Sequence, residues 1–131
     1  MLMMFRVFTV LIAVSLSVQA TAQYHLETWA EDLDHPWSMA FLPQGGALVT
    51  ELSGQLRLID ASGAVGRPLE NVPEVYFAGQ GGLFDVVLNP GFADNRLVYL
   101  SFAEGDSKDN GTAVARGRLV GNALQGVEIA P

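Results

Sequence analysis

The sequence has no cysteine, few basic residues and, after its first 30 residues, no sustained helical periodicity. The absence of cysteine excludes a disulfide, a thiolate metal site and a cysteine nucleophile. Seven Lys and Arg stand against 14 Asp and Glu, which gives a formal charge of -7. Because nucleic-acid binding depends on clustered cations, we expect no nucleic-acid partner. The 131 residues, half of them hydrophobic, suffice for one small domain or part of a larger one.

The first 22 residues have the features of a secretory signal peptide. An apolar run, Val7–Val18, follows a short head with one cation, and the small residues Ala20 and Ala22 fit a signal-peptidase site. The alternative interpretation is a membrane anchor. Because the run is shorter than the roughly 20 residues that a helix needs to cross a bilayer, we expect no stable anchor. We predict cleavage after Ala22, with Ala20 as the alternative, and a secreted or periplasmic chain of residues 23–131.

The rest of the sequence has an all-β pattern. Short apolar or β-branched runs alternate with clusters of Gly, Pro, Asn and Asp, as in strands joined by tight turns. The expected strands are Trp37–Leu42, Ala47–Glu51, Gln55–Asp60, Val65–Leu69, Leu83–Leu88, Arg96–Ala103 and Thr112–Leu119. The first four are close enough in sequence to form a meander.

The chain also contains an internal repeat. Trp37–Pro43 aligns with Phe84–Pro90 at an offset of 47, and each is a strand that starts with an aromatic residue and ends at Pro. Ala47–Thr50 aligns with Leu97–Leu100 at an offset of 50. A unit of four strands that recurs every 40 to 50 residues or so is typical of a β-propeller blade. A β-sandwich with accidental internal similarity is the alternative.

The expected propeller is incomplete. Blades bury their apolar faces only against neighbouring blades, and a ring needs roughly four to eight of them. We count fewer than two complete blades, and Val127–Pro131 has the pattern of an interrupted strand. The sequence therefore predicts that residues 23–131 are the N-terminal part of a longer propeller, its first one-and-a-half to two blades. Such a piece should expose apolar blade faces that favour association.

Neither histidine has a convincing catalytic partner in the sequence. His25 lies close to the expected mature terminus, and His35 precedes Pro36, which should hold it in an extended turn conformation. We therefore predict no catalytic residue in this chain.

One loop superficially resembles a calcium-binding loop. In the segment Asp106–Gly111, Lys108 occupies a position where that loop needs an oxygen ligand, so we predict a solvated hairpin tip and no metal ligand. Asn110-Gly111 is expected to form the two-residue turn, although Asn110 also begins a glycosylation sequon.

The segment Gly79-Gln80-Gly81-Gly82 is the best candidate for a binding loop. Three glycines allow the backbone to come close to another group, while the Gln80 amide offers both a donor and an acceptor. The segment precedes the first strand of the second repeat, and inner strands of a propeller lead toward the central channel, where ligands commonly bind. Gln80 is therefore our candidate pocket residue, and an incidental turn residue is the alternative.

The order and spacing of several short stretches of the chain resemble those of one known family. The chain is similar to the glucose/sorbosone dehydrogenases, and most closely to the bacterial PQQ-dependent aldose sugar dehydrogenases. The matching stretches are His35-Pro36-Trp37, Ala40–Pro43, Leu48–Glu51, Gly54–Arg57, Val72–Val75, Gly79–Leu83, Asp85-Val86, Asn89-Pro90, Phe92-Ala93, Asn95–Ser101 and Gly111–Val114.

The resemblance implies a fold and an activity. It implies a six-bladed propeller that binds pyrroloquinoline quinone (PQQ) and calcium near its channel. The aldose substrate is oxidised at its C1 hydroxyl to a lactone: a histidine takes the hydroxyl proton, hydride passes to the quinone, and an external acceptor takes the electrons. In the family the Gln of the Gly-Gln-Gly-Gly stretch faces the sugar, and Gln80 matches it.

Other parts of the family's site are missing from the sequence. The Asn-His-x-Gly-Gly-Arg stretch with the catalytic histidine is absent, as are the cofactor clamp and the calcium ligands, and His35 belongs to a different motif. We therefore expect the chain alone to be inactive and its complete protein to be the dehydrogenase. Leu52 also departs from the family, which commonly has Arg there. A non-catalytic propeller that binds a sugar or a protein is the alternative.

Overall fold

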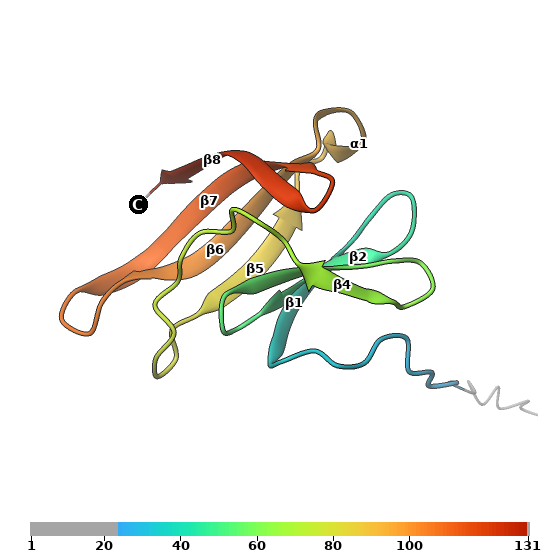
Figure 1. Cartoon of the computed structure of the whole chain (residues 1–131), viewed down its shortest axis with the longest axis horizontal. Helices are drawn as coiled ribbons and strands as arrows, with labels where there is room; N and C mark the ends of the chain where they lie inside the picture. Colours follow the sequence, from blue (N-terminus) through green and yellow to red (C-terminus); the bar gives the residue numbers. More distant parts are fainter. Residues whose placement is uncertain (1–23, 131) are drawn as a thin grey trace, which may run out of the picture.

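The computed structural model describes residues 24–130 as two four-stranded antiparallel sheets (Figure 1), so the predicted all-β class is confirmed. The first sheet has the order β1-β2-β3-β4, the second β5-β6-β7-β8. The elements are β1 (Pro36–Phe41), β2 (Ala47–Glu51), β3 (Gln55–Ile59), β4 (Val65–Pro68), β5 (Leu83–Leu88), α1 (Phe92–Asn95), β6 (Leu97–Gly105), β7 (Asn110–Val120) and β8 (Ala123–Ala130). The predicted signal peptide lies outside the described residues. Within 24–130, no helix has the length and hydropathy to span a membrane.

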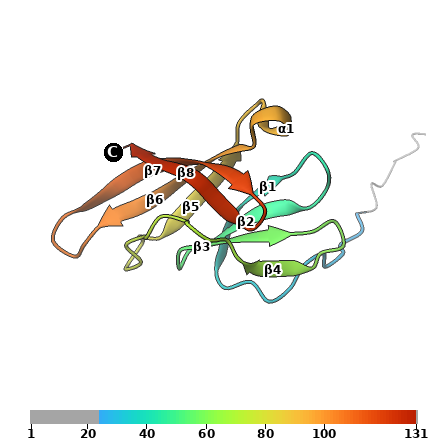
Figure 2. The same cartoon turned by 45° about the horizontal axis from the view of Figure 1, so that its top comes forward.

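The two sheets pack through their buried faces, with β5 lying against β1 and β2 (Figures 1 and 2). Leu48 and Leu56 from the first sheet and Leu100 and Phe102 from the second belong to one core cluster, and all four are almost fully buried. Burial of each such side chain contributes about 1.5–3 kcal/mol, so this apolar layer is the main force that holds the sheets together. In β7, alternate residues face this layer.

The structure confirms the repeat and corrects its register. Met39 pairs with Val49 in the first sheet, and Val86 with Leu100 in the second, so the offset is 47 on the first strand and 51 on the next. The predicted offset of 50 is wrong by one residue, which would place every side chain of β6 on the opposite face. Four extra residues form the turn α1 between β5 and β6, and a short helical turn has no apolar signature.

Hydroxyl groups connect the inner strands of the two sheets. The Thr50 hydroxyl donates to the Phe84 carbonyl oxygen at 2.6 Å and accepts the Ser38 N–H at 3.0 Å. The Val86 N–H donates to Ser38 Oγ at 3.4 Å, and the Trp37 and Phe84 ring centroids are 6.2 Å apart. Main-chain groups of β5 that do not take part in a ladder are thereby satisfied across the interface.

The outer strands are connected by the segment that leaves β4. Glu70 forms a parallel bridge with Ala123, and its N–H donates to the Asn122 carbonyl oxygen at 2.9 Å. The Asn122 side chain donates to the Pro68 carbonyl oxygen at 3.0 Å. The chain therefore crosses from the outer edge of the first sheet to the outer edge of the second before it returns to β5.

Two strand predictions need correction. The second sheet has a fourth strand, β8, that begins at Ala123 and not at Val127. Gly126, with φ +58°, and the irregular register opposite Arg116 and Arg118 obscure its alternation in the sequence. Arg96 does not begin β6, because it has φ +59° and ends α1. The described residues therefore contain two four-stranded sheets.

Both outer faces of the sheet pair expose apolar side chains. On β1 the exposed fractions are 59% for Trp37 and 68% for Phe41, and on the opposite face Val87 is 57% exposed. Trp29, from the segment before β1, covers part of the first face, with its ring centroid 6.2 Å from that of Phe41. Apolar faces of this kind are typical of sheets that pack against further layers.

The Thr50 hydroxyl gives a testable prediction. We expect Thr50→Val to lower the free energy of unfolding of residues 23–131 by about 1–3 kcal/mol, because the Phe84 carbonyl loses its partner. Thr50→Ser keeps the hydroxyl and should cost less. Urea unfolding followed by tryptophan fluorescence measures both variants. Equal stability of the Val and Ser variants would contradict the role assigned to the hydroxyl.

Candidate functional site

The candidate site lies at the end of the sheets where β1 and β5 begin. Leu52, in the turn between β2 and β3, connects the segment that leads into β1 with the segment that leads into β5. Its N–H donates to the His35 carbonyl oxygen, and its carbonyl oxygen accepts the Leu83 N–H, each at 3.0 Å. His35 and the Gly79–Gly82 segment therefore sit at the same end of the molecule, on either side of this turn.

Each glycine of the Gly79–Gly82 segment has a distinct physical role. Gly79 has φ +61°, a conformation that side chains with a Cβ rarely adopt. A Cβ on Gly81 would lie 2.5 Å from the Tyr76 carbonyl oxygen, and one on Gly82 would lie 2.2 Å from that of Leu52. The Leu52 side chain packs on Gly82, which is the structural role of the residue that departs from the family pattern.

Gln80 lies at the rim of an open hollow of about 460 Å³. Its side chain is exposed and its amide makes no hydrogen bond with other residues in 24–130. The hollow is also lined by Tyr76, Phe84, Asn110 and Thr112, and by no charged side chain. An uncharged polar hollow with one free amide suits a neutral, hydroxylated ligand.

The hairpin between β6 and β7 forms the far wall of this hollow. Asp106 Oδ1 accepts the N–H groups of Lys108 at 2.7 Å and Asp109 at 3.1 Å, and these bonds lower the pKa of Asp106. The tip is therefore held by an ionised carboxylate, whose contribution is lost as the pH falls through this lowered pKa. The predicted solvated hairpin tip is confirmed.

The predicted turn within that hairpin is wrong. Asn110 and Gly111 belong to β7 and pair with Gly105 and Glu104, so the turn comprises residues 106–109. The Asn110 side chain donates to the Asp106 carbonyl oxygen at 2.8 Å and closes the longer turn. This longer turn places Asn110 in the wall of the hollow, opposite the Gln80 loop.

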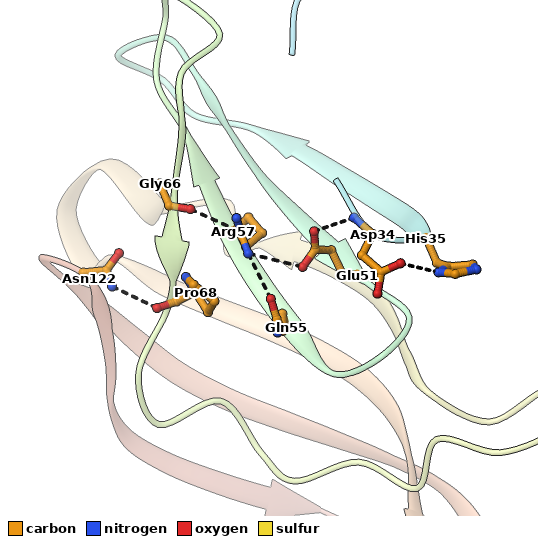
Figure 3. A network of polar contacts seen from close by, with 8 residues as sticks. All are labelled: Asp34, His35, Glu51, Gln55, Arg57, Gly66, Pro68 and Asn122. Carbon is orange, nitrogen blue, oxygen red and sulfur yellow. Dashed lines mark hydrogen bonds and ion pairs between the residues drawn. The ribbon is translucent and has the colours of Figure 1, made fainter. Parts of the chain in front are cut away.

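A polar network lies behind the start of β1 (Figure 3). Glu51 is only 1% exposed, and its Oε1 accepts the Asp34 N–H at 2.8 Å. Its Oε2 has no hydrogen-bond partner in the described part of the chain and lies 3.6 Å from Arg57 Nη1. Arg57 is held in turn by Gln55 Oε1 at 2.9 Å and by the Gly66 carbonyl oxygen at 3.0 Å. Glu51 therefore fixes the approach to β1, and Arg57 balances its charge.

The sequence did not identify this network. Its one signal was a carboxylate, Glu51, at the end of an otherwise apolar strand, since carboxylates are almost never fully buried unless they are paired. The partner, Arg57, becomes adjacent only because β2 and β3 form a tight hairpin.

The two histidines lie outside the hollow. His25 is exposed in the segment before β1. His35 has φ +49°, so the prediction that Pro36 holds it extended is wrong. Its Nδ1 lies 2.5 Å from Asp34 Oδ1, and the two side chains are 70% and 67% exposed. The carbonyl of His35, and not its ring, makes the contact that organises this end of the molecule.

The described residues do not fit the carboxylates of PQQ or a calcium ion. Most of the cations are engaged elsewhere: Arg57 with Glu51, Arg67 with Glu70, Arg116 with Glu128, Arg118 with the Asn95 carbonyl and Arg96 over the Phe92 ring. Lys108 lies on the hairpin tip, and no cation lines the hollow. Within residues 24–130 no three His, Asp or Glu side chains converge to hold a metal.

The fold and the glycine-rich loop define a class of protein. Two consecutive four-stranded meanders, stacked through their inner strands, are adjacent blades of a β-propeller. The family described as Glucose / Sorbosone dehydrogenase matches residues 33–130, and the chain belongs to this family.

Two curated relatives match most of the chain. The chain is 48% identical over 102 residues to aldose sugar dehydrogenase YliI of Escherichia coli (strain K12), a match that covers 76% of this chain and 28% of that protein. It is 37% identical over 102 residues to the uncharacterized protein slr1608 of Synechocystis, covering 72% and 25%. The chain thus spans about a quarter of the length of each.

Solved structures agree with the fold. The apo form of soluble aldose sugar dehydrogenase from Escherichia coli has a TM-score of 0.74 at 44% identity, covering 79% of this chain and 31% of that one. The PQQ-bound form of aldose sugar dehydrogenase from Streptomyces coelicolor has a TM-score of 0.66 at 31% identity, covering 79% and 32%. The two four-stranded sheets and these structural matches together confirm the propeller prediction.

Gly82 allows a prediction about the shape of the loop. We expect Gly82→Ala to destabilise residues 23–131 by about 1–3 kcal/mol, because its Cβ would overlap the Leu52 carbonyl. Gly111→Ala is the matched control, since a Cβ there meets nothing within 4 Å, and it should change stability by less than about 0.5 kcal/mol. Urea unfolding of the two variants makes the comparison. Equal effects would show that the close contact with Leu52 is unimportant.

Glu51 gives a second prediction. Glu51→Ala should cost about 1–3 kcal/mol of stability, because it leaves the Asp34 N–H and Arg57 without their partner. Glu51→Gln should cost less, since its amide oxygen still accepts the Asp34 N–H. Glu70→Ala, which removes an exposed ion pair with Arg67, should be nearly neutral. Thermal unfolding distinguishes them, and a neutral Glu51→Ala would contradict the assigned role.

Proposed function

We propose that this chain is the N-terminal part of an exported PQQ-dependent sugar dehydrogenase. In the proposed reaction the C1 hydroxyl of an aldose is oxidised to the lactone, with hydride transfer to the quinone. Membership of the Glucose / Sorbosone dehydrogenase family supports this proposal, as do the aldose sugar dehydrogenases among its relatives, one of them PQQ-bound.

Among the residues of this chain, the proposal rests on Gln80, whose free amide lies at an uncharged hollow. The amide oxygen can accept a hydrogen bond from a sugar hydroxyl while the amide nitrogen donates to another oxygen. An amide does not titrate near neutral pH, so Gln80 orients the sugar and does not take its proton. The close contacts of Gly81 with Tyr76 and of Gly82 with Leu52 fix the backbone that carries the Gln80 side chain.

The remaining groups of the site are proposed to come from outside residues 24–130. A quinone with three carboxylates needs several cations, and calcium needs oxygen ligands, neither of which converges at the hollow. The chain contains no Asn-His-x-Gly-Gly-Arg stretch, so no proton acceptor of that type is present. We therefore expect the 131-residue chain alone to be inactive.

Export is part of the same proposal. Residues 1–22 would direct the chain across the membrane and be removed after Ala22, and residues 23–131 would begin the propeller domain. A sugar oxidised outside the cytoplasm requires an external acceptor for the electrons carried by the quinone. N-terminal sequencing of the exported protein would check the cleavage position.

A full-length chimera can test the role of Gln80. In this chimera, residues 33–130 replace the matching segment of the Escherichia coli aldose sugar dehydrogenase. With PQQ and calcium added, Gln80→Ala should lower kcat/KM for aldoses about 5- to 150-fold, the equivalent of one lost hydrogen bond of about 1–3 kcal/mol. Gln44→Ala, an exposed glutamine in the turn at the other end of β1, is the control and should have no effect.

The outcomes separate the proposal from its rival. An active chimera whose kcat/KM is unchanged by Gln80→Ala would assign Gln80 to the turn alone. A correctly folded chimera without dye reduction across a panel of aldoses would contradict the enzymatic proposal and favour a non-catalytic propeller that binds a sugar or a protein.

A further inference from the structure

The loop that carries Gln80 returns to the point from which it starts. At its beginning the Tyr76 N–H donates to the Ala103 carbonyl oxygen at 2.7 Å, and at its end the Gly82 carbonyl oxygen accepts the Ala103 N–H at 2.8 Å. Ala103 belongs to β6, and the hairpin tip that forms the far wall of the hollow begins shortly after it, at Asp106. The Gln80 loop and the opposite wall of the hollow therefore extend from one anchoring residue.

The turn between β2 and β3 supports the same loop from the first sheet. A Cβ on Gly82 would lie 2.9 Å from both Cγ and Cδ1 of Leu52, so the Leu52 side chain packs directly on the last residue of the loop. Gly54, in the same turn, makes a similarly close approach to Val75, because a Cβ there would lie 2.8 Å from Val75 Cγ2. The turn thus touches the chain just before the Gln80 loop and again at its end.

Between these supports the middle of the loop is exposed. A Cβ on Gly79 would meet no atom of residues 24–130 within 4 Å, and Ala78 and Gln80 are both exposed. The Gly81 N–H donates to the Ala78 carbonyl oxygen at 2.9 Å, which is a bond within the loop. The position of the Gln80 amide is therefore determined by the two ends of the loop.

We propose that Leu52 is a positioning residue for the sugar and acts through Gly82 on Gln80. This inference rests on the proposed function, in which the Gln80 amide contacts a sugar hydroxyl. Leu52 is not among the residues that line the hollow, so it acts on a ligand there only through the loop. Its side chain holds Gly82, and the main chain from Gly82 to Gln80 transmits that constraint to the amide.

The reaction is sensitive to this contact because small displacements matter at a reacting centre. Groups that bind the substrate must be held within about 0.5 Å of the productive geometry, and a displacement of about 1 Å can lower a rate about 100-fold. Truncation of Leu52 to Ala removes Cγ and both Cδ atoms from beside Gly82, which leaves room for a shift of that order. The cost therefore appears in kcat/KM for the sugar as well as in the stability of the fold.

A double-mutant cycle in the full-length chimera tests this role. With PQQ and calcium present, Leu52→Ala should lower kcat/KM for aldoses about 5- to 50-fold, and by no more than Gln80→Ala does. In a Gln80→Ala background the same substitution should change kcat/KM less than about twofold, because no amide is left to position. Leu52→Met, which nearly conserves the side-chain volume, should keep kcat/KM within about threefold of the parent. If Leu52→Ala does not fold, Leu52→Val is the smaller truncation for the same cycle.

Leu88→Ala is the matched control. Leu88 is also a partly buried leucine, and it lies at the other end of β5, away from the loop. Its truncation should lower the melting temperature, as Leu52→Ala does, but leave kcat/KM of the folded chimera unchanged. Circular dichroism at the assay temperature verifies that all variants are folded.

Hydrogen exchange gives a readout that does not depend on activity. In the chimera, Leu52→Ala should speed the exchange of the Gly81 and Leu83 amides about tenfold, because these residues flank Gly82 and donate to the Ala78 and Leu52 carbonyl oxygens. Leu88→Ala should leave the exchange of both amides unchanged.

Two results would overturn the proposal. One is an equal loss of kcat/KM on Leu52→Ala with and without the Gln80 side chain, which would make the role of Leu52 purely structural. The other is unchanged exchange at Gly81 and Leu83. A folded chimera that reduces no dye would contradict the proposed function and, with it, the role of Leu52 in the reaction; faster exchange in that chimera would show that only the link to the sugar is wrong.

Discussion

The stacking of one sheet on the next is the constraint on which the rest of this structure depends. A single four-stranded meander has two apolar faces and cannot bury either alone. Here the buried layer around Leu48 and Phe102 supplies most of the energy, and the Thr50 hydroxyl fixes the relative position of the sheets by satisfying the Phe84 carbonyl. Because the glycine-rich loop leads directly into β5, the same contact also determines where Gln80 lies.

Much of the fold could be predicted from the sequence because strand alternation and turn residues are local signals. The aromatic starts at Trp37 and Phe84 gave the correct offset for the first strand of each sheet. The predicted offset between β2 and β6 was wrong by one residue. The sequence shows that the second unit has a longer turn, but it does not show that this turn is helical or at which residue β6 begins. β8 was recognised only in part, since Gly126 interrupts its alternation.

The candidate site was predictable to a smaller extent. The glycines around Gln80 indicated a close approach, and the approach is real, but the partner of Gly82, Leu52, is distant in sequence, and the contact of Gly81 with the nearby Tyr76 depends on the conformation of the loop. The burial of Glu51 and the left-handed conformation of His35 depend on contacts between segments that no local pattern reports. The absence of cations around the hollow of residues 24–130, by contrast, agrees with the acidic composition of the chain.

The most direct test of this account is an experimental structure of residues 33–130 within a full-length protein. The account predicts β1 and β5 as the innermost strands of two separate sheets, with Thr50 Oγ1 within hydrogen-bond distance of the Phe84 carbonyl oxygen. If β1 and β5 were instead joined in one continuous ladder, or if their faces were turned away from each other, the stacked-blade arrangement would be wrong.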